Sequence, residues 1–453
     1  MTSTRQTRTT APRHRPSQAW LVWSVGVLAY VVAVAQRTSL GVMGLTAASH
    51  FGAPASLVAT FMVLQLAVYA LMQVPAGLLL DRWGPRLVLS LGGLLMTVGQ
   101  ALMALSDQTG PAMVARVLVG IGDACTFGSA IRLVPAWFPA RQVPLLTQLT
   151  GLLGQLGQIA SAVGLVSLVS GAGWRVGYLV AAGTGAVVTL VVAVVLRDGP
   201  AEAPFVRSAV SWRTLPRQVG EVARHPATHL AFWAHWTTNF PAIVFAMMWG
   251  MPFITRAQGR STATASALMS LYVLTSAVSG PVAGVLTQRH PLRRSSLIIA
   301  MIALSLLPWL AVLAWPGRAP GWLLAVLAAG LGLSLPGGSV GFDVARTWHP
   351  GHRLGTATGV AIMGGFSAGL VAIEVIGLTL DRLCPDGHYT LGGFRWAMAT
   401  QLPFYLVGIV GILTSRRRLR SRLAAQGVLV PPWREALARQ RRLWQRHHGR
   451  SSG

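Results

Sequence analysis

Five charged residues lie inside long apolar segments of this chain, where a charge needs a specific purpose. A charged side chain at the middle of a bilayer costs about 3 kcal/mol or more. An arginine there offers a planar fork of donors that suits a carboxylate, whereas an acid in a partly dry cavity can load and release a proton near neutral pH. These residue types together predict anion binding and proton movement. The five residues are Arg37, Arg116, Asp123, Asp343 and Glu374.

Helical spacing places some of these residues on common faces. Arg116 and Asp123 are two helical turns apart, and so are Tyr30 and Arg37. We therefore predict that Arg37, Tyr30 and Arg116 contact a substrate and that Asp123 couples its movement to a proton. The alternative is that Arg116 and Asp123 form a structural ion pair or a gating contact. Glu374 is either a second proton-coupling acid or a structural partner.

Further polar residues interrupt the apolar segments. Asp343 precedes Arg346 by one helical turn near the end of its segment, which predicts a gating pair. Asn239 and Gln155 are predicted to contact the substrate, with helix packing as the alternative for Gln155. His235 is a weaker candidate for a proton relay.

A charged turn lies between the second and third apolar segments. It reads Gly77-Leu-Leu-Leu-Asp81-Arg82-Trp-Gly84-Pro-Arg86. A short charged turn between hydrophobic segments is atypical of a soluble core, and it lies far from the middle of either segment. We predict that Gly77, Asp81, Arg82, Gly84 and Arg86 govern gating rather than substrate affinity.

The composition requires a membrane. The chain has 453 residues, of which 53% are hydrophobic and only 11% charged, with mean hydropathy +0.56. Segments long enough to span a bilayer recur at 19–44, 55–80, 87–105, 111–135, 143–170, 174–196, 227–254, 262–287, 295–315, 320–345, 353–380 and 393–414. We predict an all-α membrane protein with twelve transmembrane helices in two six-helix bundles. The predicted parts are a tail (1–18), an N-terminal bundle (19–196), a linker (197–226), a C-terminal bundle (227–414) and a basic tail (415–453).

Internal repetition supports two equivalent halves. The turn around Gly77 recurs around Gly284, where Gln288 replaces Asp81, and Trp137 corresponds to Trp348 at nearly the same offset.

The net charge of +26 comes from arginines that concentrate in the tails, the linker and the loops on their side. This bias predicts that both termini and the linker are cytoplasmic, in the cell membrane. The arginine-rich end, 416–450, is expected to touch anionic lipid headgroups, which we favour over a tail that binds nucleic acid. The chain is expected to be a monomer.

The charged turn resembles the signature loop between helices 2 and 3 of the major facilitator superfamily of secondary transporters. The resemblance covers residues 19–414. It implies that helices 1, 4, 7 and 10 line a central cavity, and Arg37, Arg116, Asp123 and Asp343 lie on such helices.

Two shorter motifs are similar to those of the anion:cation symporter family. That family has Asp-Arg-x-Asn/Ser in helix 1 and Arg-x-x-x-Gly-x-x-Glu/Asp-Ala in helix 4. This chain has Arg37-Thr-Ser39 and Arg116-Val-Leu-Val-Gly-Ile-Gly-Asp123-Ala. The resemblance implies that Arg37 serves an anionic substrate and Asp123 serves proton coupling. Gln36 replaces the family's helix-1 acid, which removes one acid from a two-acid proton relay.

The resulting prediction is proton-coupled symport of a small organic anion by alternating access. The alternative is a proton-driven exporter of drugs or metabolites, although the fifth segment lacks the proline of the antiporter motif. A nitrate porter is disfavoured because segments 2 and 8 contain no internal arginine, and a receptor or scaffold would need a further domain. No nucleotide loop, metal cluster or nucleophile triad is visible, so we expect no enzyme activity, cofactor or metal.

Overall fold

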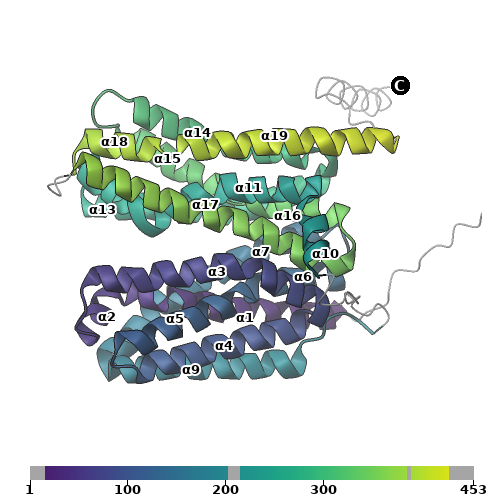
Figure 1. The fold of residues 1–453 in the computed structure, drawn as a ribbon, viewed down its shortest axis with the longest axis horizontal. Coiled ribbons are helices and arrows are strands. Elements are labelled where there is room, and N and C mark those ends of the chain that lie inside the picture. The colour runs from purple at the N-terminus through teal and green to yellow at the C-terminus, as the bar shows by residue number, and fades with distance from the viewer. Residues whose placement is uncertain (1–15, 202–214, 385–388, 428–453) are drawn as a thin grey trace, which may run out of the picture.

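The structure is a computed structural model that describes residues 16–201, 215–384 and 389–427, and these residues form helices and turns but no strands. Two bundles lie side by side (Figure 1). The N-terminal bundle contains α1 (Pro16–Val42), α2 (Gly44–His50), α3 (Ala55–Trp83), α4 (Pro85–Leu105), α5 (Thr109–Ala124), α6 (Thr126–Trp137), α7 (Val143–Gly154), α8 (Leu156–Ile159), η1 (Ala160–Leu165) and α9 (Val166–Val195).

The C-terminal bundle follows the short helix α10 (Leu215–Ala223), which lies in the predicted linker. It contains α11 (Pro226–Ile243), η2 (Val244–Trp249), α12 (Gly250–Pro252), η3 (Phe253–Ala257), α13 (Thr262–Arg289), η4 (Pro291–Arg293), α14 (Arg294–Ala314), α15 (Gly321–Ser334), α16 (Gly337–Trp348), η5 (Gly351–Arg353), α17 (Leu354–Leu383), α18 (Leu391–Ala399) and α19 (Leu402–Ala425). Helix α19 continues beyond residue 414, the predicted end of the apolar segment, and its last residues form an arginine-rich helical extension.

The described residues contain eleven segments that are long and apolar enough to cross a membrane. One of them, Val143–Val195, has 53 residues, which would extend about 80 Å as a single helix. Gly173 breaks it, because its φ of 85° and ψ of 168° are not helical. This segment therefore holds two spans, and the twelve predicted membrane helices are confirmed.

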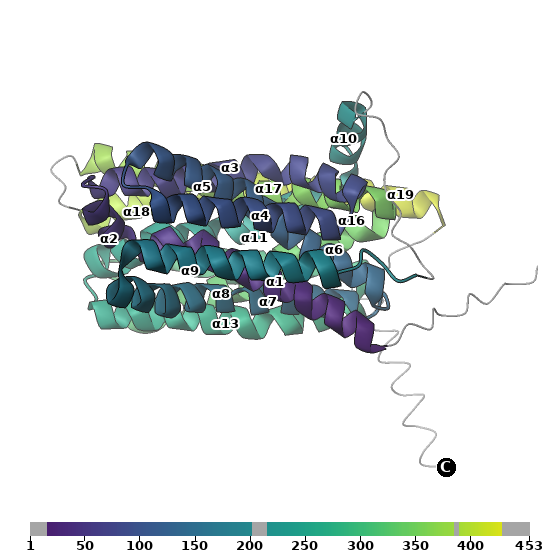
Figure 2. The same cartoon turned by 90° about the horizontal axis from the view of Figure 1, so that it is seen from below.

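Both chain ends of the described core lie at the same end of the molecule. Figure 2 shows the start of α1, the end of α19 and α10 at this end, which we call the linker end. Across the bundle interface, α3 packs against α17 and α7 against α13. Small residues allow this approach, because a Cβ atom added at Gly77 would lie 2.3 Å from the Gly355 carbonyl oxygen.

Several spans lose regular α-helical geometry near their middle. The fourth span is interrupted at Cys125, between α5 and α6, and the tenth at residues 335–336, between α15 and α16. The fifth and seventh spans contain the π-helical turns η1 and η2. Irregular backbone at membrane depth is tolerated where protein or a cavity covers it, and the breaks at Cys125 and at residues 335–336 are flanked by buried residues.

Candidate functional site

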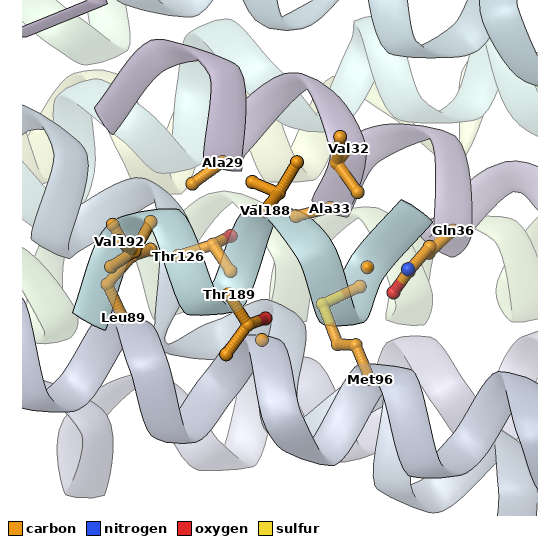
Figure 3. A pocket seen from close by; sticks show the side chains of 12 residues that line it. Ala29, Val32, Ala33, Gln36, Leu89, Met96, Thr126, Val188, Thr189 and Val192 are labelled. Atoms are coloured by element: carbon orange, nitrogen blue, oxygen red, sulfur yellow. The ribbon is translucent and has the colours of Figure 1, made fainter. Parts of the chain in front are cut away.

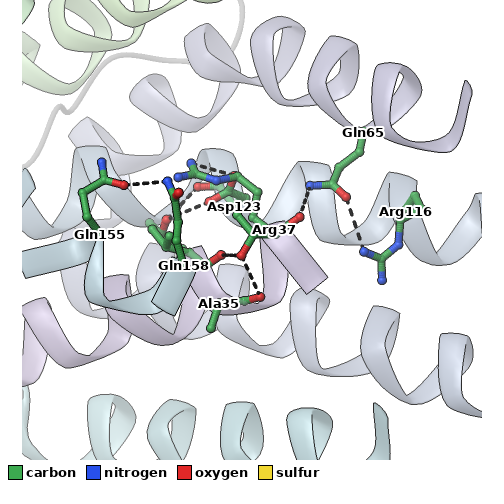
Figure 4. A network of polar contacts seen from close by, with 10 residues as sticks. Ala35, Arg37, Gln65, Arg116, Asp123, Gln155 and Gln158 are labelled. Atoms are coloured by element: carbon green, nitrogen blue, oxygen red, sulfur yellow. Dashed lines mark hydrogen bonds and ion pairs between the residues drawn. The ribbon is translucent and has the colours of Figure 1, made fainter. Parts of the chain in front are cut away.

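A buried ion pair lies between the first and fourth spans. Arg37 of α1 donates from Nη1 to Oδ2 of Asp123 on α5 over 3.3 Å (Figure 4). The Asp123 side chain is 1% exposed, whereas that of Arg37 is 17% exposed. The hydroxyl of Thr126, just beyond the break in the fourth span, donates to the backbone oxygen of Asp123 over 2.8 Å and lies 3.4 Å from its Oδ1. Arg37 is therefore the principal donor to this carboxylate, and the arginine retains access to its surroundings.

Tyr30 and the fifth span border this pair. The Tyr30 hydroxyl lies within hydrogen-bonding reach of Arg37, and the Tyr30 ring packs against the backbone of Gly154. Gln158 donates to Gln155 over 2.6 Å, and both appear beside the pair in Figure 4. Two of the predicted substrate contacts, Tyr30 and Gln155, therefore lie around Arg37.

Arg116 lies on α5 with Asp123, but its hydrogen bonds go to other residues. It is fully buried, and it donates to Ser39 over 3.2 Å, to Gln65 over 3.4 Å and to Gln100 over 3.1 Å. Figure 4 shows Gln65 between Arg116 and the backbone oxygen of Arg37. The ionic partner of Asp123 is thus Arg37, and Arg116 supports the helix that carries it. A direct contact between Arg116 and the substrate stays a prediction.

The C-terminal half presents uncharged groups toward the centre. His235 of α11 is buried, and its Nδ1 accepts the backbone N–H of Gly365 on α17 over 3.2 Å. Asn239, one turn later, donates to Thr238 over 3.4 Å. A Cβ atom added at Gly338 would lie within 2.7 Å of both His235 and Asn239, so glycine lets α16 approach these side chains closely.

The charged turn joins the two halves at the linker end. Asp81 accepts three hydrogen bonds from α17, namely from the backbone N–H of Gly355 over 2.7 Å and from the backbone N–H and hydroxyl of Thr356 over 2.8 and 2.7 Å. Arg132 adds a bond to the Gly351 carbonyl over 2.7 Å. The carboxylate of Asp81 therefore holds the start of the eleventh span against the second.

The remaining residues of the turn fasten it to the sixth span. Gly84 has a φ of 84°, and a Cβ atom there would lie 2.4 Å from the Asp198 carboxylate. The backbone N–H of Arg86 donates to the same carboxylate over 2.7 Å, and its side chain donates to the Ala193 carbonyl over 2.9 Å. Arg82 is half-buried at the end of α3.

Asp343 and Arg346 form an ion pair of 2.9 Å within α16, as predicted from their spacing. Both lie at the linker end and line a crevice between the halves together with Arg132. Glu374 lies elsewhere, on an exposed stripe of α17 with Val371. The gating role of the pair and the proton-coupling role of Glu374 stay predictions.

A small crevice within the N-terminal half lies beside this site, and Thr126 belongs to both. It lies between α1, α4 and α9 and has a volume of about 300 Å³ including its open mouth (Figure 3). Its lining is apolar apart from Gln36, Thr126 and Thr189 and contains no charged residue. The crevice therefore offers no charged partner to an anion.

Comparison with known proteins agrees with this architecture. The profile of the Major Facilitator Superfamily matches residues 26–255 and 242–448. A probable sulfoacetate transporter of Cupriavidus necator is 23% identical over 82% of this chain and 89% of its own length. A probable L-galactonate transporter of Escherichia coli is 30% identical, but the match spans only 25% of each chain. The structure of the human organic anion transporter MFSD10 (TETRAN) has a TM-score of 0.62 at 15% identity, covering 88% of this chain and 100% of that one, and so shares the fold.

Proposed function

The chain belongs to the Major Facilitator Superfamily, and from that premise we propose that it moves a small organic anion across the membrane together with a proton, by alternating access. It is a multi-pass membrane transporter and not an enzyme. The observation that carries the proposal is the ion pair between Arg37 and Asp123. Relatives whose names specify sulfoacetate and L-galactonate support an organic anion as the substrate.

The ion pair couples the two ligands through competition for one cation. While Asp123 is ionised, it occupies a donor of Arg37 and neutralises its charge. When Asp123 binds a proton, its side chain becomes neutral and no longer balances the charge of Arg37. The guanidinium, which is mostly buried but accessible on one side, then favours an incoming carboxylate or sulfonate. The anion and the proton therefore bind together, and either one alone leaves an uncompensated charge.

Asp81 supports the conformational part of the cycle. Its three hydrogen bonds hold the linker end closed around the start of α17, and hydrogen bonds to a charged group contribute about 1.5–3 kcal/mol each. Because Asp81 lies at the end of α3, its contacts affect the equilibrium between states rather than the anion contacts at Arg37.

We expect Asp81→Ala to slow transport at least roughly fivefold while the half-saturating anion concentration stays within about twofold, since the lost hydrogen bonds join α3 to α17 at the linker end and involve none of the residues around Arg37. Initial uptake rates in proteoliposomes measure both quantities. Thr356→Val removes one of the three bonds and serves as the graded control, with a smaller effect in the same direction. A large loss of affinity at normal turnover would contradict a gating role.

The arginine bias supports an orientation with both termini and the linker in the cytoplasm. Residue 211 of the linker lies outside the described residues. A cysteine placed there, in a chain whose native Cys125 and Cys384 are buried, should react with an impermeant reagent only after the cells are opened. Labelling in intact cells would reverse the orientation.

A reconstitution experiment tests the proposed function. Proteoliposomes with an imposed inward proton gradient should accumulate a transported organic anion, and a protonophore should abolish the accumulation without blocking entry down the concentration gradient. Uptake that is equally large with and without the proton gradient would contradict symport.

A further inference from the structure

Six ring side chains form a continuous arc beside the ion pair. Tyr30 and Tyr69 both lie near the guanidinium of Arg37 and form the two ends of the arc. Between these ends each ring lies next to the following one, so the two ends of the arc meet at Arg37. The ring centroids are 5.1 Å apart for Tyr30–Phe127, 6.1 Å for Phe127–Phe342, 5.4 Å for Phe342–His235, 6.2 Å for His235–Phe366 and 4.5 Å for Phe366–Tyr69.

The arc contains residues of both halves. It crosses the interface twice, at Phe127–Phe342 and at Tyr69–Phe366. His235, between the two phenylalanines, stacks on both with interplanar angles of 28° and 29°. Its Nδ1 accepts a backbone N–H and therefore carries no proton, so that the ring is neutral in this arrangement. The C-terminal half thus contributes apolar and neutral rings to the site.

Few arginines lie near the arc. Arg37 provides one positive charge. The next arginine on the lining spans of the N-terminal half, Arg116, is fully buried; its Nη atoms donate to three neutral acceptors, and its Nε has no hydrogen-bond partner among the described residues. Arg132 and Arg346 lie at the linker end, beyond Phe342. A second anionic group on a substrate body that packs on the arc would therefore face six rings with no arginine among them, which is costly in a dry site.

We propose that the preferred substrate is a monoanion with a flat apolar body, whose charged head pairs with Arg37 and whose body packs on the aromatic arc. This inference rests on the proposed function and narrows its substrate class. One anionic head replaces one carboxylate at one arginine, so the charge balances with a single proton on Asp123. The body is recognised by burial of apolar surface and by offset or edge contacts with the rings.

Three sulfonates separate the charge of a substrate from the shape of its body. Benzenesulfonate has one charge and a ring, ethanesulfonate has one charge and no ring, and sulfoacetate has two charges. Sulfonates stay ionised near neutral pH, so they do not carry protons across lipid by themselves. Proteoliposomes of the full chain that enclose a pH-sensitive dye report proton entry when each anion is added at a slightly acidic external pH.

We expect benzenesulfonate to drive proton entry with a half-saturating concentration roughly tenfold below that of ethanesulfonate, because a buried ring adds apolar contact area. Sulfoacetate should be the weakest of the three. A preference for sulfoacetate over benzenesulfonate, with proton entry that depends on Arg37, would overturn the inference while the proposed function stands. Failure of every anion tested, these sulfonates and small carboxylates alike, to move protons would overturn the proposed function itself.

A substitution in the arc distinguishes recognition from packing. Phe366→Leu removes a ring but keeps an apolar side chain, and it should raise the half-saturating concentration of benzenesulfonate several-fold without affecting that of ethanesulfonate. The matched control is Phe404→Leu, at a half-buried phenylalanine that stacks on Trp236 away from the arc. Equal effects of Phe366→Leu on both anions would mean that the arc only seals the interface, and would overturn the inference.

Discussion

Replacing Asp123 with asparagine is expected to abolish proton-driven accumulation while exchange of the anion across the membrane continues. Asparagine keeps the size of the side chain but cannot bind and release a proton near neutral pH. Arg37 then loses its competing carboxylate permanently and stays available to the anion. In the native protein a gradient of one pH unit supports about tenfold accumulation, whereas Asp123→Asn should bring the internal concentration only to the external one. Uptake with and without a proton gradient, and counterflow at equal pH, measure the two properties.

Glu374→Gln is the matched control for this substitution. It makes the same acid-to-amide change on the exposed stripe of α17, and accumulation should stay intact if Asp123 alone couples the proton. If Asp123→Asn still concentrates the anion and Glu374→Gln does not, proton coupling belongs to Glu374. That result would also mean that proton coupling does not depend on the ion pair between Asp123 and Arg37.

Arg37→Lys is expected to weaken anion binding by roughly tenfold to a hundredfold, because an ammonium group cannot replace the planar fork of the guanidinium. Lysine keeps the positive charge, so the loss reports geometry rather than charge. The half-saturating concentration in exchange measurements shows the effect without involving the proton gradient.

Arg116→Lys makes the same chemical change in the buried network. The guanidinium donates to Ser39 and Gln65 from Nη1 and to Gln100 from Nη2, whereas the three donors of an ammonium leave from a single nitrogen. We therefore expect a lower melting temperature and an affinity change well below that of Arg37→Lys. An affinity loss at Arg116 with normal affinity at Arg37 would instead place the anion on Arg116, as its spacing from Asp123 had also allowed.

The membrane helices and the charged turn were predictable because their signals are local. Apolar segments of sufficient length, the run from Gly77 to Arg86 and the arginine in the first span can each be recognised within a few residues. The break at Gly173 also falls between two predicted spans, although these form one continuous apolar segment of 53 residues. The pair Asp343–Arg346 was also predictable from local sequence, because the two residues lie one helical turn apart.

The sequence was less informative about which residues on neighbouring helices form ion pairs and hydrogen bonds with each other. Helical spacing placed Asp123 on one face with Arg116, but it cannot tell which neighbouring helix that face meets, and the structure pairs Asp123 with Arg37. Two of the three partners of Asp81 are backbone N–H groups, which carry no residue signature. Gln65 and Gln100 had no distinguishing spacing, since each shares its apolar span with other polar residues such as Gln73 and Thr97. The aromatic arc depends on contacts between halves and has no sequence pattern.

The most direct measurement of competition between proton and anion is proton uptake on binding. The purified chain is titrated with whichever sulfonate it transports, in weakly buffered detergent solution near neutral pH with an indicator dye. We predict that the native protein takes up about one proton for each anion bound, because Asp123 must be neutralised when the anion replaces it at Arg37. Asp123→Asn should bind the same anion without proton uptake. Binding to the native protein with no proton uptake, or equal uptake in the variant, would contradict the exchange at Arg37 on which the proposed mechanism rests.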